Sequence, residues 1–357
     1  MEIAVSIEVS ITKKFPGRGG GSAFTLDNHF EAKGHLAILG ASGSGKSMTL
    51  KCIAGIETPD AGRIEVNGRV LFDSQAKVNL MPRMRQAGYL FQNYALFPAM
   101  DTLHNVLAAL SSKSYSKAEK KNRARAWLAK MELSGFERHK PHELSGGQQQ
   151  RLALARLLAS EPDFILLDEP FSALDASLRE FMHFQFLEIL AGYTTAVLVT
   201  HSRDEAYKLC PEILVMDAGK PLCAGSREEV FANPGTVTAA RLTGCKNISP
   251  ARRTGAHELY AADWELPLRL PQIVPPGITH VGIRAHDIEE AERNFSAGPN
   301  YLRPALTRYG DELFETVFLF TNAGAPSSKE IWWKVKRGAP FPALFYFPPE
   351  KLLLLRE

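Results

Sequence analysis

The chain has 357 residues, of which 45% are hydrophobic and 23% are charged, and its formal net charge is +3. This length exceeds that of one typical domain and predicts two, the first large enough for a substantial core. So small a positive charge does not indicate a surface for nucleic acid or anionic lipid. No stretch approaches the roughly 18 to 20 uninterrupted apolar residues of a membrane-spanning helix. Any connection with a membrane is therefore expected to run through a partner.

The chain contains four cysteines: Cys52, Cys210, Cys223 and Cys245. They form no C-x-x-C pair and no nearby histidine has zinc-finger spacing, so buried reduced thiols are the better interpretation. Such thiols fit a reducing cytosol. The first residues, MEIAVSIEVSITKKF, alternate apolar and polar side chains, which is typical of a strand and not of a signal peptide.

Strand patterns and helical patterns alternate through the first two thirds of the chain. Short apolar or alternating runs predict strands at 4–10, 24–30, 35–40, 163–170 and 194–202. The segments MTLKCIAGI, ended near Gly55, and ASLREFMHFQFLEILAGY have helical spacing. Dense charge at helical spacing over 102–136 predicts a surface helical insertion. Apolar strands that alternate with helices indicate a mostly parallel sheet covered on both faces.

Two hairpins are predicted. In RIEVNGRVLF, at 63–72, Asn67-Gly68 supplies the two positive-φ positions of a tight turn. In EILVMDAGKPLCAG, at 212–225, the turn falls at Ala218-Gly219-Lys220.

The character of the chain changes past about residue 235. Prolines and short strand-like pieces dominate there and predict a small β-barrel or sandwich. The segment FANPGTVTAARLTGCKNIS, 231–249, is interpreted as a connector. The expected domains are 1–235, with a helical subdomain at about 93–145, and 236–357.

Residues 40–47, GASGSGKS, match the pattern G-x-x-x-x-G-K-[ST] in full. Glycines let backbone N–H groups converge on phosphate oxygens, and the helix start that follows adds its positive dipole end. Lys46 is then placed for the β- and γ-phosphates and the Ser47 hydroxyl for Mg²⁺. A chance glycine-rich turn is the alternative, but a strand before the loop and a helix after it favour phosphate binding. The loop consists of Gly40, Ala41, Ser42, Gly43, Ser44, Gly45, Lys46 and Ser47.

The apolar strand FILLDE ends in Asp168 and Glu169. Such a strand delivers carboxylates to the carboxyl edge of a parallel sheet, where ligands of these folds bind. Asp168 would hold the magnesium and Glu169 would polarise an attacking water. The alternative is that Asp-Glu-Pro simply ends a strand and Glu169 is solvated, but the phosphate loop makes catalysis the favoured interpretation.

A second glycine-rich helix start is LSGGQQQR, at 144–151. Ser145 and Gln148 have the spacing of a capping box, which satisfies backbone donors at a helix start. The box does not explain Gly146 and Gly147, because glycine lowers helix propensity by about 1 kcal/mol in a helix interior. Glycine there allows close approach of another group, and at a helix N-terminus the favoured group is an anion.

The segments GASGSGKS, LSGGQQQR, FILLDEP, SALD and VTHS occur in the order and spacing of an ATP-binding cassette (ABC) transporter ATPase, which the chain resembles. The resemblance implies an α/β P-loop NTPase with a RecA-like parallel core sheet, an antiparallel β subdomain and a helical subdomain, followed by a small β-rich, barrel-like domain. It implies ATP and Mg²⁺, and two subunits facing head to tail. Ser145, Gly146, Gly147 and Gln148 of one subunit would contact the nucleotide of the other, so a lone subunit should hydrolyse ATP slowly.

The resemblance assigns four further residues. Gln92 matches a glutamine loop that reaches Mg²⁺ or the attacking water, and His201 matches a switch histidine at the γ-phosphate. Asp175 matches a loop that crosses the dimer interface, although it would also serve as a helix N-cap. Phe15 matches an aromatic residue that stacks on adenine, with a core or loop phenylalanine as its alternative.

A separate ATPase with a β-rich tail resembles subunits of bacterial importers. The implied partners are integral-membrane permease subunits and, indirectly, a solute-binding protein, with the chain peripheral at the cytoplasmic face of the membrane. Leu96, Phe97 and Pro98 would line a groove for the permease or belong to the core of the insertion. A soluble, nucleic-acid-associated cassette is less favoured, because the chain has one cassette, no long coiled-coil insertion and a charge of only +3.

The transported solute is harder to predict, because the ATPase does not touch it. GRVLFDS, RLTGCKNIS and VGIRAHDI resemble segments of molybdate and sulfate importer ATPases, with molybdate ahead of sulfate. The resemblance implies that the tail is a regulatory domain of the TOBE type, which either binds an oxyanion or regulates the dimer. Arg284 and His286 are candidate anion contacts there, or ordinary solvated side chains.

Overall fold

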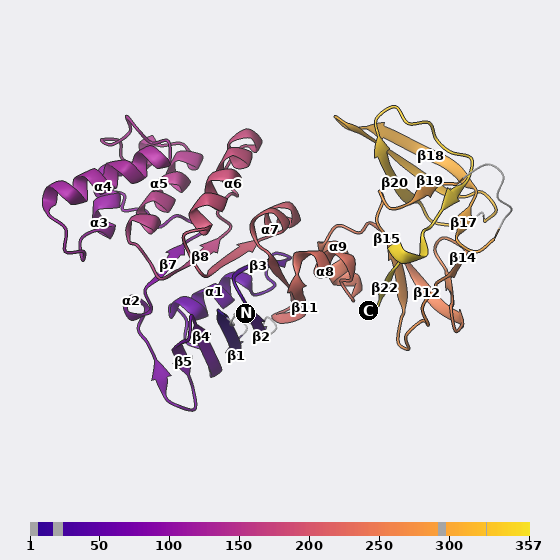
Figure 1. Ribbon diagram of the computed structural model, residues 1–357, viewed down its shortest axis with the longest axis horizontal. Coiled ribbons are helices and arrows are strands. Elements are labelled where there is room, and N and C mark those ends of the chain that lie inside the picture. Colours follow the sequence, from indigo (N-terminus) through magenta and orange to yellow (C-terminus); the bar gives the residue numbers. More distant parts are fainter. Residues whose placement is uncertain (1–5, 17–23, 292–297, 326) are drawn as a thin grey trace. The chain divides into compact units, whose positions relative to one another are not determined.

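The computed structural model describes residues 6–16, 24–291, 298–325 and 327–357 (Figure 1). Two compact units divide the chain, an N-terminal unit, Met1–Arg227, and a C-terminal unit, Glu228–Glu357. The boundary between them lies earlier than residue 235, where the sequence predicts it.

The N-terminal unit contains an antiparallel sheet of order β2-β1-β4-β5-β6. Its strands are β1 (Ile7–Phe15), β2 (Phe24–Ala32), β4 (Ala61–Val66), β5 (Arg69–Asp73) and β6 (Val78–Asn79). The first predicted strand, 4–10, begins outside the described residues, and β1 extends beyond its end. The predicted β4–β5 hairpin is confirmed, because Asn67 and Gly68 have φ values of 51° and 73°.

A second sheet, of order β11-β10-β3-β9-β8-β7, positions the candidate site. Its strands are β3 (His35–Gly40), β7 (Ala87–Leu90), β8 (Phe164–Asp168), β9 (Ala196–Thr200), β10 (Glu212–Asp217) and β11 (Lys220–Ser226). Neighbouring strands run parallel from β10 to β7, whereas β11 turns back antiparallel to β10. All residues of β8 and β9 are buried, which explains their continuous apolar sequences. The predicted mostly parallel sheet is confirmed.

Helix α1 (Lys46–Ala54) packs against both sheets in one hydrophobic core. Alternate side chains of the parallel sheet, such as Leu36 on β3 and Leu166 on β8, belong to this core together with side chains of α1 and of the antiparallel sheet. Because side chains in a strand alternate between faces, Asp168 shares the face of Phe164 and Leu166. Asp168 therefore lies at the end of β8 on the side that α1 covers.

The remaining helices of this unit are α2 (Pro82–Arg85), α3 (Thr102–Ala109), α4 (Lys117–Lys130), α5 (Gly146–Ala159), α6 (Ala176–Leu190) and α7 (Arg203–Leu209). In Figure 1, α3, α4 and α5 gather at one end of the unit. Helix α4 buries only Ala124 and Leu128, as its dense charge predicts. No helix of the described residues combines the length and the apolar character needed to cross a membrane.

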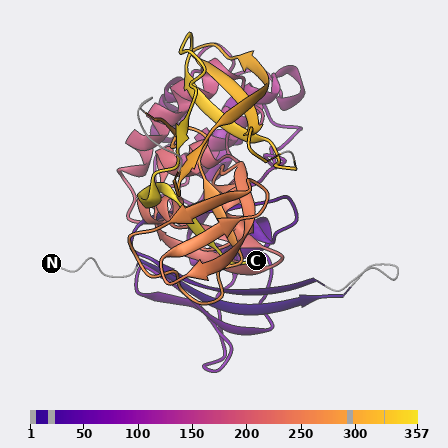
Figure 2. The same cartoon turned by 90° about the vertical axis from the view of Figure 1, so that its right-hand side faces the viewer.

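The C-terminal unit is mostly strand, drawn in orange and yellow in Figures 1 and 2. One sheet holds β14 (Leu266–Arg269), β13 (Glu258–Ala261), β12 (Asn247–Gly255), β15 (His280–Ile283) and β22 (Leu353–Leu355). Two smaller sheets hold β16 (Glu289–Glu290), β21 (Phe345–Tyr346) and β17 (Tyr301–Leu302), and β18 (Pro304–Asp311), β19 (Glu315–Asn322) and β20 (Ile331–Lys336). A single core joins the sheets and includes Trp264, Phe320 and Phe345. The predicted β-rich architecture is confirmed.

The segment 231–249 is not a connector, which corrects the interpretation from sequence. It contains the end of α8 (Arg227–Ala232) and all of α9 (Val237–Leu242). Ala240 and Cys245 pack against Leu353 and Leu355 of β22 in a small core of their own. The small apolar residues of this segment therefore belong to the C-terminal unit.

Arg284 stabilises the same region and is not a free anion contact. Its guanidinium donates to the carbonyl oxygens of Thr243, at 2.7 Å, and Phe231, at 2.5 Å. These bonds connect the end of β15 to α8 and to the residue after α9. His286 is exposed, and its Nε2 lies 3.8 Å from Oδ1 of Asp287. The solvated interpretation therefore holds for His286.

All four cysteines are free thiols, as the sequence predicts. Burial raises the pKa of Cys52 to about 12 and those of Cys223 and Cys245 to about 11. Burial also raises the pKa of Cys210. Thiols of this kind are unreactive at neutral pH.

Candidate functional site

The phosphate loop, residues 40–47, joins β3 to α1 in a conformation that its glycines allow. Gly43 and Gly45 have φ values of 81° and 102°, in the left-handed region that favours glycine. A Cβ atom on Gly40 would lie 2.4 Å from the carbonyl oxygen of Met216, so a larger residue does not fit there. The glycines therefore serve the loop geometry itself.

Two polar side chains of this loop are arranged to hold an anion. Lys46 Nζ donates to the carbonyl oxygens of Gly40, at 2.8 Å, and Ala41, at 2.7 Å, so the ammonium group lies against the curve of the loop. Ser44 Oγ is buried and makes no hydrogen bond to any described residue. An unsatisfied buried hydroxyl is costly, and a phosphate oxygen would give it an acceptor. The loop therefore fits the phosphates of a nucleotide.

The β10–β11 turn braces this loop, which the motif alone does not reveal. The Gly219 N–H donates to the Ser44 carbonyl oxygen at 3.0 Å, and the Gly219 carbonyl accepts from the Asp27 N–H at 2.8 Å. A Cβ atom on Gly219 would lie 2.1 Å from the carbonyl oxygen of Thr25. The turn glycine is visible in the sequence, but its contact with the phosphate loop is a product of the fold.

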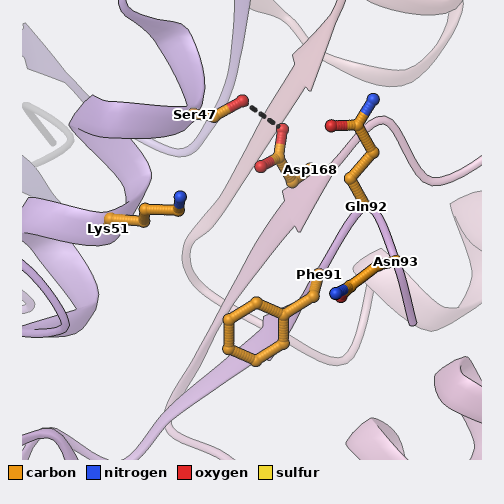
Figure 3. A pocket seen from close by; sticks show the side chains of 6 residues that line it. All are labelled: Ser47, Lys51, Phe91, Gln92, Asn93 and Asp168. Atoms are coloured by element: carbon orange, nitrogen blue, oxygen red, sulfur yellow. Dashed lines mark hydrogen bonds between the residues drawn. The ribbon is translucent and has the colours of Figure 1, made fainter. Parts of the chain in front are cut away.

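Ser47 and Asp168 meet beside a cavity of about 320 Å³ (Figure 3). Ser47 Oγ donates to Asp168 Oδ1 at 2.8 Å. In Figure 3, Ser47 and Gln92 flank Asp168 across the cavity. The other lining residues are Lys51, Phe91 and Asn93, which the sequence interpretation missed. The fold thus brings together Ser47, Gln92 and Asp168, the residues that the sequence assigns to Mg²⁺.

The donors around this cavity suit Mg²⁺. A hydroxyl, an amide and a carboxylate are hard oxygen ligands, which this ion prefers. Nowhere in the described part of the chain do three or more His, Cys, Asp or Glu side chains gather as a metal cage. Mg²⁺ commonly binds through one or two carboxylates together with substrate phosphates. This donor set therefore fits a magnesium ion that arrives with a nucleotide.

Burial sets the protonation equilibria of the two charged groups at the site. It raises the pKa of Asp168, and the hydrogen bonds from Ser47 and Tyr89 oppose that rise. It lowers the pKa of Lys46, while the nearby charges of Glu169 and Asp168 act in the opposite direction. Both shifts have the sign expected for charges removed from water.

Glu169 and His201, the residues assigned to hydrolysis, are in contact. Oε1 of Glu169 lies 3.1 Å from Nδ1 of His201. Glu169 has a φ value of 51°, which is uncommon for a residue other than glycine. Its N–H donates to the Val199 carbonyl at 2.9 Å, and the buried Gln150 side chain donates to the carbonyl of Pro170. Gln150, the third glutamine of LSGGQQQR, therefore supports the segment that holds Glu169, a contact that the sequence interpretation missed.

The predicted capping box at the start of α5 is confirmed. Ser145 Oγ accepts from the Gln148 N–H at 3.3 Å, and Gln148 Oε1 accepts from the Ser145 N–H at 2.8 Å. Ser145 and Gly146 are exposed, and none of the residues 145–148 lines the Ser47–Asp168 cavity. The helix start is therefore open to a group from outside the chain.

The two glycines of this helix start differ. A Cβ atom on Gly147 would lie 3.1 Å from Cδ2 of Leu174 and 3.6 Å from that of Leu178, so packing within the chain favours glycine there. A Cβ atom on Gly146 would meet nothing closer than Cβ of Ala173, at 3.9 Å. Packing within the chain therefore explains why residue 147 is glycine, but it does not explain why residue 146 is glycine.

Asp175 caps helix α6. Its Oδ1 accepts from the N–H of Leu178 at 2.9 Å, which confirms the structural alternative for this residue. Asp175 is also exposed, so the same residue is available for the interface that the resemblance implies.

The Phe15 ring lies beside the Phe24 ring, which in turn lies next to Gly45 of the phosphate loop. Its ring centroid is 5.9 Å from that of Phe24, and the Lys13 ammonium lies 5.3 Å from the centroid of the Phe15 ring. The Phe24 ring in turn approaches Gly45, since a Cβ atom on Gly45 would lie 3.1 Å from Phe24 Cζ. Phe15 is half-buried at the end of β1, next to residues outside the described part of the chain.

The segment after Gln92 borders a second cavity, of about 380 Å³. Phe97 lines this cavity and is 45% exposed, and Pro98 is exposed as well, so neither belongs to the core of the helical insertion. Leu96 is half-buried and does not line it. The buried Asn105 side chain fixes the segment, because it accepts from the Phe97 N–H at 2.9 Å and donates to the Phe97 carbonyl at 3.1 Å. Arg156 lies over the Phe97 ring, 5.2 Å from its centroid.

Known proteins resemble this chain in sequence and in fold. The ABC transporter family profile matches residues 25–172. The chain is 37% identical to the sulfate/thiosulfate import ATP-binding protein CysA of Synechococcus elongatus over 81% of this chain and 78% of that protein. It is 39% identical to the putrescine transport ATP-binding protein PotG of Escherichia coli over 67% of this chain and 62% of that protein. The match thus spans less than two thirds of the length of PotG.

Solved structures extend the comparison to the fold. The ATP-binding cassette MJ0796, in a dimeric post-hydrolysis state bound to ADP and Pi, superposes with a TM-score of 0.55 and 29% identity. The match covers 62% of this chain and 98% of that cassette. The N-terminal unit therefore has the fold of an ABC ATPase, and the chain belongs to the ABC transporter family.

Proposed function

We propose that the protein is the ATP-hydrolysing subunit of a bacterial ABC importer and acts as a head-to-tail homodimer. One observation carries the proposal. The phosphate loop, the Ser47–Asp168 pair and the Glu169–His201 pair lie at the ends of neighbouring strands, whereas Ser145 and Gly146 stand exposed at the start of α5. A second copy would bring its own helix start to the nucleotide, and the dimeric state of the MJ0796 cassette supports this arrangement.

Each side chain has a defined task in this proposal. Lys46, Ser44 and the N–H groups of residues 40–47 bind the phosphates, and Ser47, Gln92 and Asp168 hold Mg²⁺. When bound, Mg²⁺ neutralises negative charge on the phosphates. Glu169 orients a water molecule and accepts its proton, and the contact with His201 fixes the Glu169 carboxylate.

The permease is proposed to dock at the cavity beside Phe97. The segment that follows Gln92 exposes Phe97 and Pro98, and Asn105 and Arg156 hold it in place. An apolar element of an integral-membrane partner would fill this cavity and sense the position of Gln92 through the backbone between them. The protein would then lie at the cytoplasmic face of the membrane, without contact with nucleic acid.

For the cargo, we propose an oxyanion, with molybdate ahead of sulfate, delivered by a solute-binding protein. The similarity to the sulfate/thiosulfate protein over 81% of this chain supports an oxyanion. The preference for molybdate comes from GRVLFDS, RLTGCKNIS and VGIRAHDI. The domain of 236–357 is proposed to be regulatory.

Reconstitution with the permease and the solute-binding protein in lipid vesicles tests this proposal. ATP turnover is expected to rise with molybdate or tungstate, less with sulfate, and not with putrescine. An equal rise in ATP turnover with putrescine would contradict the proposal that the cargo is an oxyanion. If ATP turnover did not change with the permease but rose with added nucleic acid, the proposal of an importer would be contradicted.

A further inference from the structure

A second hydroxyl group contacts the Asp168 carboxylate. Tyr89 Oη donates to Oδ2 of Asp168 at 3.2 Å, while Ser47 Oγ donates to Oδ1 at 2.8 Å. Each carboxylate oxygen therefore has its own donor. Asp168 is only 4% exposed, so these two bonds orient it more than solvent does.

The register of the parallel sheet creates this contact. Strand β7 pairs with β8 so that Tyr89 lies beside Leu166. Residues two apart in a strand share a face, so Asp168 lies on the face of Leu166 and Tyr89, next to α1. The Tyr89 ring packs against the core around α1, and its centroid lies 4.4 Å from that of Phe91. The hydroxyl is thus held by a strand of the central sheet and not by a loop.

The two donors differ in one respect. Ser47 is itself assigned to Mg²⁺, so its hydrogen bond to Asp168 competes with metal binding. Tyr89 is not assigned to the metal, and its bond uses the other carboxylate oxygen. The bond from Tyr89 to Asp168 can therefore persist when Ser47 gives up its hydrogen bond to Asp168 and binds the metal.

We infer that Tyr89 is a positioning residue for the magnesium site, whose hydroxyl keeps the Asp168 carboxylate turned toward Ser47 as the metal binds. This inference rests on the proposed function, because it concerns the same site. Hydrogen-bond partners behind a metal ligand typically change metal affinity 10- to 100-fold when they are removed. Tyr89 should therefore act on the affinity for Mg²⁺ and not on the affinity for the nucleotide alone.

The variant Tyr89→Phe, made in the full chain, removes the hydroxyl and keeps the ring. One measurement is the Kd of a fluorescent ATP analogue in EDTA. The other is the affinity of the nucleotide-saturated protein for Mn²⁺, followed by electron paramagnetic resonance, with Mg²⁺ as competitor. We expect metal affinity to fall about tenfold or more, with an unchanged Kd in EDTA. The maximal hydrolysis rate should recover at a higher Mg²⁺ concentration.

The chain offers a matched control in Tyr115→Phe. Tyr115 Oη donates to Oε1 of Glu161 at the same distance of 3.2 Å, and neither residue lines the Ser47–Asp168 cavity. This variant also loses a tyrosine-to-carboxylate hydrogen bond. Its metal affinity is expected to equal that of the unmodified protein.

The outcomes separate the inference from the proposed function. The inference is overturned if Tyr89→Phe and Tyr115→Phe have the same metal affinity. It is also overturned if Tyr89→Phe weakens nucleotide binding in EDTA by the same factor as it weakens metal binding. Tyr89→Met is a second variant without a donor and must reproduce the metal effect. If neither Tyr89 variant folded, the hydroxyl would be needed for the fold itself, and the inference of a positioning role would be overturned. If the unmodified protein bound no nucleotide, the proposed function and the inference would both fall.

Discussion

Nδ1 of His201 lies 3.1 Å from Oε1 of Glu169, although the two residues follow different strands. Strands β8 and β9 are parallel neighbours, so residues just past their carboxyl ends meet at one edge of the sheet. In the proposed function, this contact lets His201 orient the Glu169 carboxylate, which is the proposed general base.

Glu169→Gln is expected to lower ATP turnover by a factor of about 10² to 10⁴, the usual contribution of a general base. ATP binding should persist, because the phosphate loop is unchanged. Phosphate release and nucleotide titration measure the two effects, and Glu180→Gln, at an exposed position on α6, is the control. Unchanged turnover in Glu169→Gln would exclude the base role.

His201→Ala is expected to reduce turnover about 10²-fold, because the Glu169 carboxylate loses the partner that orients it. The Kd for ATP should change little. Single-turnover hydrolysis measures the effect, and His286→Ala, on the exposed surface of the C-terminal unit, is the control. A normal rate in His201→Ala would show that Glu169 needs no partner.

Asp168→Asn is expected to raise Tm in EDTA by about 2–4 °C while it abolishes Mg²⁺-dependent hydrolysis. Burial raises the pKa of Asp168 above its value in the unfolded chain. The stabilising contribution of such a group is present below the unfolded pKa and is lost as pH rises through the folded pKa. The ionised carboxylate therefore destabilises the metal-free protein at neutral pH.

Thermal unfolding at several pH values measures this effect of Asp168. The advantage of Asp168→Asn should disappear at acidic pH, where the unmodified carboxyl is neutral. Asp175→Asn is the control, since asparagine caps a helix as well as aspartate does. A lower Tm for Asp168→Asn at neutral pH would contradict the argument.

Gly146→Ala is expected to leave Tm unchanged or slightly higher, since the Cβ atom has open space and alanine favours helix. ATP-dependent dimerisation and turnover should nevertheless fall about 10²-fold, because the backbone can no longer approach the nucleotide of the partner closely. Gly147→Ala should be less stable than Gly146→Ala, because its Cβ atom would lie 3.1 Å from Cδ2 of Leu174 and that side chain would have to shift. Full turnover in Gly146→Ala would contradict the proposal that this helix start contacts the nucleotide bound by the partner.

Arg85→Met is expected to lower the free energy of unfolding by about 3 kcal/mol. The fully buried guanidinium donates to the carbonyl oxygens of Cys52, Ile53 and Leu80, each at 2.8 Å. The first two belong to the last turn of α1, so Arg85 caps the helix that the phosphate loop begins. Denaturant unfolding measures the loss, and Arg83→Met, exposed in the same short helix, is the control. Equal stability of the two variants would contradict the capping role.

Local chemistry made much of the fold predictable. Asn67-Gly68 specifies a tight turn, Gly55 ends a helix with a φ value of 78°, and Ser145 with Gln148 forms a capping box, all through contacts of a few neighbouring residues. The interpretation of 231–249 as a connector is wrong because its small apolar residues pack against β22, which lies more than a hundred residues later. No local pattern reports such a partner.

By itself, the sequence determined which residues are the candidates for the chemistry, because a phosphate loop and a strand ending in two carboxylates are local patterns that follow from backbone geometry. Tertiary structure alone decided how these pieces support one another. The register of β7 on β8 sets Tyr89 against Asp168, the β10–β11 turn sets Gly219 against the phosphate loop, and Gln150 reaches the carbonyl behind Glu169. These contacts join residues far apart in the chain, and their positions depend on how the strands pair and how the helices pack on them.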